Sequence, residues 1–137
     1  IEVDRECENF KIPKLTIVTF VENACVHGIE SKSSPGWIFV RIGRQEEGLE
    51  IEIEDTGSGM TEAKLAKLQN NMCNASIEML KGGGRVGIIN ACVRLKMVTE
   101  NRAEFCVEGE EGVGTTVTIR IPCLQEGKTD AESIVSR

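Results

Sequence analysis

The chain has 137 residues, 40% of them hydrophobic and 28% charged, and this composition predicts one compact domain rather than a disordered or fibrous chain. Twenty-two acidic residues against sixteen Lys and Arg give a net charge of −6, which argues against nucleic acid as a partner. The apolar stretches at residues 15–26 and 86–93 are too short and too polar to cross a bilayer. The alternating start at residues 1–4 indicates a fragment of a longer protein.

The first half of the sequence predicts a strand, a helix and a hairpin. These elements lie at residues 1–7, 14–27, 37–44 and 49–55. Pro13 precedes the helical pattern and Gly28 ends it. In the second hairpin strand Glu50, Glu52 and Glu54 alternate with apolar residues, so we expect them to form a solvated face of the sheet rather than a site.

The second half predicts helices and a second hairpin. The helices are expected at residues 61–68, 75–81 and 86–98, and the strands at 104–108 and 113–122. A polar stretch, 69–74, separates the first two helices. The element order predicts an α/β two-layer sandwich, with helices on one face of a mixed sheet. Residues 1–123 form the expected domain and 124–137 a flexible tail.

The six cysteines are spread along the chain and form no CxxC pair, which argues against a zinc site. They are Cys7, Cys25, Cys73, Cys92, Cys106 and Cys123. Four of them stand among apolar residues in predicted helices or strands. We expect them to be reduced thiols that pack as small hydrophobic side chains.

Two polar groups stand out in the predicted elements. Asn23 and His27 share a helix face, and Glu22 lies next to Asn23. Together they could present an amide, an imidazole and a carboxylate to one ligand. Such oxygen ligands suit Mg²⁺ beside phosphates, although an exposed helix end explains them equally well. Asp55 ends a predicted strand just before Gly57. Its carboxylate could accept a hydrogen bond from the exocyclic amine of adenine, or it could belong to an ordinary turn.

Glycines and one rival motif complete the candidates. The run at residues 82–87 leads into a helix, whose free N–H groups favour anions, but no GxxxxGK[ST] motif occurs. The first threonine of the strand at 113–122 is Thr115, whose hydroxyl could support Asp55. The letters Asp-Thr-Gly-Ser at 55–58 also occur in aspartic proteases, where two such aspartates share a proton.

In order and separation these segments resemble the GHKL ATP-binding superfamily, and in detail the catalytic domain of LytS/YesM-type sensor histidine kinases. The segments that match the family's boxes are residues 12–15, 20–24, 27–29, 55–60, 83–90, 94–95 and 114–122. The resemblance implies a Bergerat-type ATP-binding fold with ATP and Mg²⁺ as cofactors. It makes residues 1–123 a histidine-kinase-like ATPase domain.

The resemblance also implies roles for single residues. Asn23 would bind Mg²⁺, Asp55 would recognise adenine with help from Thr115, and Gly57 and Gly59 would form the floor beside the base. The implied catalytic residues are Glu22, Asn23 and His27. The implied phosphate-binding residues are His27, Gly83, Gly84, Arg85 and Gly87. Residues 60–82 would form a mobile lid.

For the whole protein the resemblance implies a kinase that transfers the γ-phosphoryl group of ATP to a histidine on a dimerisation hairpin absent from this chain. A response regulator would act downstream, and the full-length protein would be anchored in the membrane with this domain in the cytoplasm. The fragment would be a monomer that does not phosphorylate itself. Val26 stands where a lysine is common and Arg85 where a glycine is usual. These departures leave a nucleotide-binding module without transfer activity as an alternative. An anti-sigma-type serine kinase, which shares the superfamily boxes, is another.

Overall fold

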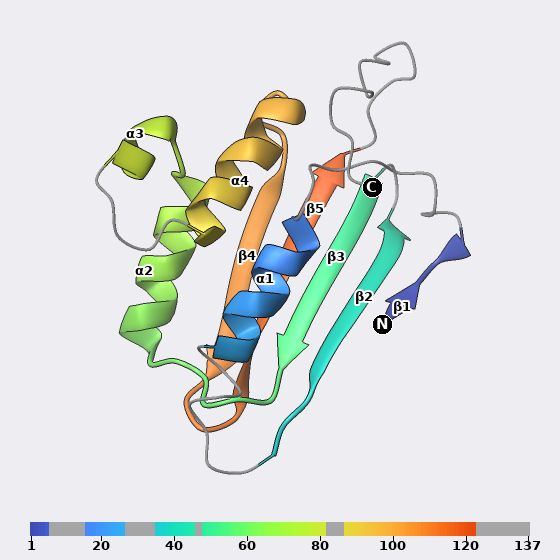
Figure 1. The fold of residues 1–137 in the computed structure, drawn as a ribbon, viewed down its shortest axis with the longest axis vertical. Helices are drawn as coiled ribbons and strands as arrows, with labels where there is room; N and C mark the ends of the chain where they lie inside the picture. The colour runs from blue at the N-terminus through green and yellow to red at the C-terminus, as the bar shows by residue number, and fades with distance from the viewer. Residues whose placement is uncertain (6–15, 27–34, 46–47, 82–86, 123–137) are drawn as a thin grey trace.

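The computed structural model describes residues 1–5, 16–26, 35–45, 48–81 and 87–122. Within these ranges a five-stranded sheet carries helices on one face (Figure 1). The strands are β1 (Glu2–Val3), β2 (Ile38–Gln45), β3 (Gly48–Asp55), β4 (Glu104–Glu110) and β5 (Gly114–Pro122). The helices are α1 (Thr16–Ala24), α2 (Glu62–Cys73), α3 (Ile77–Lys81) and α4 (Gly87–Val98).

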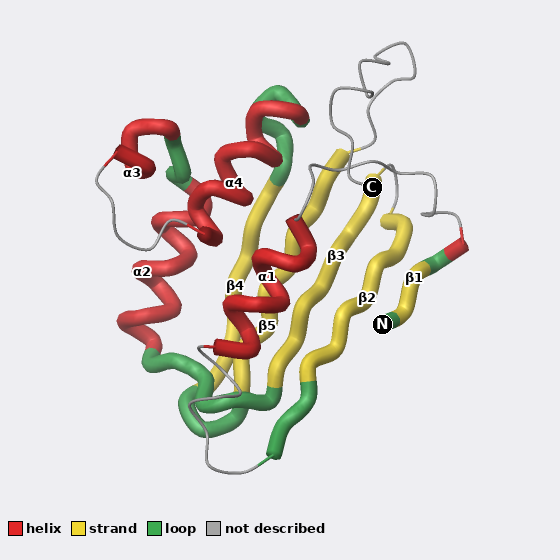
Figure 2. The backbone as a smooth tube through the Cα atoms, in the orientation of Figure 1, coloured by secondary structure: helices red, strands yellow, loops and turns green. Residues whose placement is uncertain are grey.

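The sheet has the strand order β1-β2-β3-β5-β4, which Figure 2 shows beneath the helices. β1 runs parallel to β2, and every other neighbouring pair is antiparallel. The sheet is therefore mixed, and the predicted α/β two-layer sandwich is confirmed. Asp55 stands opposite Ile38 on one side and opposite Thr115 on the other.

The core lies between the sheet and the helices. Ile51 and Ile53 of β3 face the helices and are almost fully buried, as are Phe20 of α1 and Leu95 of α4. Each such side chain stabilises the fold by about 1.5–3 kcal/mol through removal from water. The buried residues of α1 and α4 meet those of the sheet in a single cluster. This cluster fixes the two helices above the centre of the sheet.

The other face of the sheet is polar. Arg41 reaches two glutamates of β3, Glu52 at 3.4 Å and Glu54 at 3.1 Å, and Arg120 reaches Glu50 at 3.0 Å. These ion pairs are partly exposed, so each contributes little to stability. The prediction that the glutamates form a solvated face is confirmed.

Helix α2 is longer than the sequence predicted. We expected it to end at residue 68, but it continues to Cys73 through the polar stretch. The side-chain amide of Gln69 explains this extension. Its Nε2 donates to the carbonyl oxygen of Phe105 at 2.8 Å, and its Oε1 accepts from the N–H of Val107 at 2.8 Å. One turn later Met72 is completely buried.

The four described cysteines take part in no disulfide bond, and they differ in burial. Cys92 is fully buried, Cys25 and Cys106 are half-buried, and Cys73 is exposed. Burial raises the pKa of the Cys92 thiol to about 12. Cys92 therefore behaves as the small core hydrophobe that we expected, whereas Cys25 and Cys106 are only partly buried.

Several predictions fall on residues that the structure does not describe. They concern the ends of the strand at 1–7 and of the helix at 14–27, the glycine run and the tail at 124–137. No helix in the described part of the chain has the length and apolar character needed to span a bilayer.

Candidate functional site

Asp55 ends β3 as a buried carboxylate. Only 6% of the residue is exposed, and its Oδ1 accepts the N–H of Gly57 at 2.8 Å. Burial of a charged group requires such donors. Thr115, also buried, lies directly across from Asp55 on β5. The structure therefore brings together the two residues that the sequence predicted to act as a pair.

The loop after Asp55 is held by the turn between β4 and β5. The carbonyl oxygen of Ser58 accepts the N–H of Gly112 at 2.7 Å. Gly59 has φ +70°, and a Cβ at this position would lie 2.1 Å from the carbonyl oxygen of Glu110. Only glycine permits both this backbone conformation and this close approach. The loop therefore has a fixed path beside the end of β3.

Helix α1 presents polar residues beside its buried face. Phe20 and Ala24 face the core, whereas Asn23 is half-buried and Glu22 is exposed. The amide of Asn23 and the carboxylate of Glu22 both line a cleft, together with Thr19 one turn earlier. The cleft has a volume of about 880 Å³.

Four segments form the walls of this cleft: α1 with the residues after it, the loop 58–60, one face of α2, and the first turn of α4. The described residues that line it are Thr19, Glu22, Asn23, Val26, Ser58, Gly59, Met60, Lys64, Lys67, Leu68, Asn71, Gly87, Ile88 and Ile89. The apolar side chains of Met60, Leu68 and Ile88 would suit a flat ring, and the polar residues would orient it.

The structure places the predicted site residues in three groups. Glu22, Asn23, Gly59 and Gly87 line the cleft. A second group is buried beside the loop 58–60, which forms the floor of the cleft, and consists of Asp55, Gly57 and Thr115. The four that lie outside the described residues are His27, Gly83, Gly84 and Arg85.

The sequence analysis missed the contribution of α2 to the cleft. Lys64, Lys67 and Asn71 follow one another at helical spacing, which was the available signal. Within the predicted lid over residues 60–82, Gln69 and Met72 join the second half of α2 to β4 and to the core. That these residues move as a lid stays a prediction.

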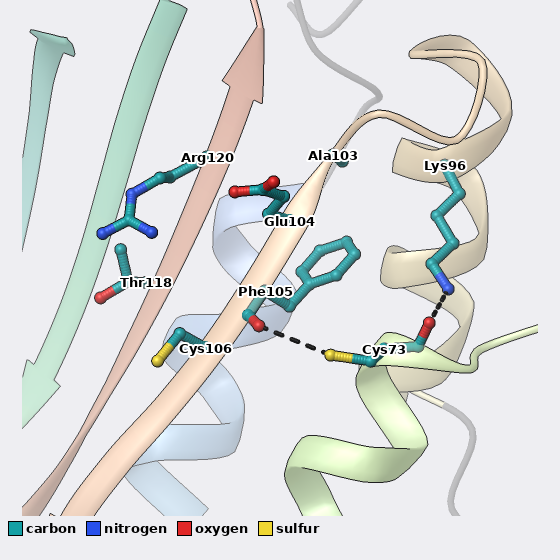
Figure 3. A pocket seen from close by; sticks show the side chains of 8 residues that line it. All are labelled: Cys73, Lys96, Ala103, Glu104, Phe105, Cys106, Thr118 and Arg120. Carbon is teal, nitrogen blue, oxygen red and sulfur yellow. Dashed lines mark hydrogen bonds between the residues drawn. The ribbon is translucent and has the colours of Figure 1, made fainter.

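A smaller cavity of about 320 Å³ lies at the outer edge of the sheet (Figure 3). Here the ammonium group of Lys96 donates to the carbonyl oxygens of Cys73 and Ala75, and the thiol of Cys73 donates to the carbonyl oxygen of Phe105 at 3.7 Å. These bonds join the end of α2 to α4 and to the edge strand β4. The cavity is therefore a structural junction in which the lysine is already occupied.

A family profile described as histidine kinase-, DNA gyrase B- and HSP90-like ATPase matches residues 13–125. The chain belongs to this family. The matched range contains α1, α2 and α4 and the loop after Asp55, so it includes every described wall of the cleft. Membership of this ATPase family, together with the two-layer fold, rules out the aspartic protease alternative.

The relatives of this ATPase domain include sensor proteins. It is 26% identical over 126 residues to the sensor histidine kinase YesM of Bacillus subtilis, an alignment that covers 92% of this chain and 20% of YesM. It is 29% identical over 120 residues to the sensor protein LytS of Staphylococcus haemolyticus, which covers 88% of this chain and 20% of LytS. The chain thus spans about a fifth of the length of these relatives.

Solved structures show the same fold. The histidine kinase domain of the blue-light activated kinase from Erythrobacter litoralis EL346 superposes with a TM-score of 0.52 at 22% identity, covering 88% of this chain and 45% of that chain. The family match and the kinase relatives confirm the predicted resemblance. The chain is therefore a domain of this ATPase family that is similar to the corresponding part of sensor histidine kinases.

Proposed function

We propose that this ATPase domain holds ATP with Mg²⁺ in the cleft between α1, α2 and α4 and donates the γ-phosphoryl group to a histidine on a dimerisation hairpin of the same full-length kinase, outside this chain. The observation that carries the proposal is the buried carboxylate of Asp55 beside the floor of the cleft. A carboxylate in this position accepts the exocyclic amine of adenine. Thr115 supports it from the neighbouring strand, and Gly57 and Gly59 leave room for the base.

Asn23 is the residue that we assign to Mg²⁺. Its half-buried side chain supplies an amide oxygen, and the neighbouring carboxylate of Glu22 lines the same cleft, so the local donors are the oxygen ligands that Mg²⁺ prefers. Within the described ranges no group of three or more His, Cys, Asp or Glu side chains gathers as a metal site, so the proposed Mg²⁺ would be held by Asn23 together with the phosphates. When bound, Mg²⁺ would neutralise charge on the phosphates.

The proposed reaction is phosphoryl transfer in line. A ring nitrogen of the acceptor histidine forms a bond to the γ-phosphorus, while the bond from that phosphorus to the bridging oxygen breaks and ADP leaves. Positioning carries most of this catalysis, so the domain's task is to orient the phosphates. Glu22 orders Asn23 or accepts a proton. The phosphate-binding set, of which Gly87 lies in the cleft, is His27, Gly83, Gly84, Arg85 and Gly87.

The phosphorylated hairpin would pass its phosphoryl group to a response regulator. We propose that the full-length kinase is anchored in a membrane and carries this domain in the cytoplasm. These partners are supported by the relatives, which include a sensor histidine kinase and a sensor protein.

Calorimetric titration with a non-hydrolysable ATP analogue, with and without Mg²⁺, tests the site. We expect saturable binding that Asp55→Asn abolishes, because the amide no longer offers two acceptor oxygens beside the base. The matched control is Asp4→Asn. Asp4 follows the edge strand β1 and accepts the N–H of Arg44 at 3.3 Å, and it lines no part of the cleft. Equal binding by wild type and Asp55→Asn would contradict the assignment.

Addition of the hairpin and ATP separates the active kinase from its alternatives. An acid-labile phosphoryl group on the hairpin is the expected product, since phosphohistidine hydrolyses in acid. An acid-stable product would indicate the serine kinase, and binding without transfer would indicate a module without catalytic activity.

A further inference from the structure

The two sides of the cleft differ in charge. On α1 the charged residue in the cleft is Glu22, whereas α2 contributes Lys64 and Lys67. These two lysines are the cationic side chains among the described residues that line the cleft. Because the whole chain carries a net charge of −6, its overall field disfavours an approaching anion. A polyanionic ligand therefore needs cations within the cleft itself.

Two contacts of α2 set which way its two lysines face. Thr61 caps the helix, and its Oγ1 accepts the N–H of Lys64 at 3.3 Å, which sets the first turn. Lys67 follows one turn later and lines the same cleft. Away from the cleft, Gln69 bonds to the backbone of β4. The helix is thereby held with its lysine-bearing face toward the cleft.

Both ammonium groups are available to a ligand. Lys64 and Lys67 are exposed, and neither forms an ion pair with any residue that the structure describes. Their situation differs from that of Lys96, which donates to two backbone carbonyls at the other end of α2. Each free ammonium offers three N–H donors to phosphate oxygens.

We propose that Lys64 and Lys67 bind the phosphate groups of the nucleotide from the α2 side of the cleft. The inference rests on the proposed function and deepens it. Asp55 and its loop select the base, while the two lysines make affinity depend on the number of phosphates. The domain then favours nucleoside di- and triphosphates over nucleosides.

The test is a set of calorimetric titrations in EDTA, so that no metal ion shields the phosphates. The ligands are adenosine, ADP and a non-hydrolysable ATP analogue, and the variants are Lys64→Met, Lys67→Met and their combination. Methionine retains the length of the side chain and removes the charge. We expect the double variant to bind the ATP analogue about tenfold more weakly and adenosine unchanged. Arginine at both positions should restore binding.

Arg102→Met is the matched control, because it also removes one positive charge but Arg102 lines no part of the cleft. An unchanged affinity of the double variant, an equal loss for all three ligands, or an equal loss in Arg102→Met would each overturn the proposal. If the wild type bound none of the ligands, the proposed function would fail as well. Asp55→Asn distinguishes the two proposals, since it should abolish adenosine binding, which the lysine variants preserve.

Discussion

Gly59 and Gly112 lie in the two loops that meet beside the cleft, and both have a left-handed backbone. Their φ angles are +70° and +85°. They differ in the space around them, because a Cβ on Gly59 would meet the carbonyl oxygen of Glu110 at 2.1 Å, whereas a Cβ on Gly112 would meet nothing within 4 Å. Substitution of Gly112 therefore tests backbone strain alone, whereas substitution of Gly59 tests backbone strain together with steric overlap.

We predict that Gly112→Ala lowers the free energy of unfolding by about 1 kcal/mol, the strain of a left-handed alanine. Gly59→Ala should cost about 1–3 kcal/mol more, because the loop must move away from Glu110. Urea unfolding of both variants measures the difference. Equal losses would show that the contact with Glu110 is relaxed at no cost.

Sequence reasoning reached the residues whose chemistry is local. It singled out Asp55 and Gly59 from the Asp-Thr-Gly-Ser-Gly run, and it linked Thr115 to Asp55 before the register of β3 and β5 was known. It did not reach Lys64 or Lys67. A lysine on a helix surface is ordinary, and only the packing of α2 beside α1 turns this pair toward a cleft.

Among the elements, α2 shows how a tertiary contact overrides a local pattern. Residues 69–74 are polar, and this polarity predicted a break between two short helices. In the structure the amide of Gln69 pairs with the edge of β4 as another strand would, and the helix continues past it. No local property of the sequence announces that partner, which lies 36 residues away at Phe105.

We predict that Gln69→Ala lowers the free energy of unfolding by about 2 kcal/mol, because it removes both hydrogen bonds to β4 and leaves the N–H of Val107 without its acceptor. The free energy of unfolding of Gln69→Glu should lie between those of the wild type and Gln69→Ala. A carboxylate still accepts the N–H of Val107 but cannot donate to the carbonyl oxygen of Phe105. Chemical denaturation gives these values. A loss below about 0.5 kcal/mol for Gln69→Ala would show that water replaces both bonds.

At the scale of the whole molecule, the sheet has two protected edges. β4 is covered by α2, and on the opposite side the outer strand β1 pairs through only Glu2 and Val3. Long exposed edges promote association between sheets, so short or covered edges oppose it. The alternating patterns of the strands and the helical periodicity of α1 and α4 were sufficient to predict this architecture, but not which side chain would cover an edge.

We predict that the chain is a monomer in solution, and that Gln69→Ala associates as concentration rises because the edge of β4 opens. Light scattering coupled to size exclusion measures both. A dimer of the wild-type chain would contradict the prediction. Association of the wild type and the variant to the same extent would show that the edge is not the contact.

The hydrogen bond from the N–H of Gly112 to Ser58 connects an exposed turn with the floor of the cleft. That amide belongs to a residue at the molecular surface, yet it exchanges its proton with solvent only when the floor separates from the turn. The rate at which this amide takes up deuterium therefore reports how often the loop at Ser58 separates from the turn. NMR can follow it without a substitution or a ligand in the cleft.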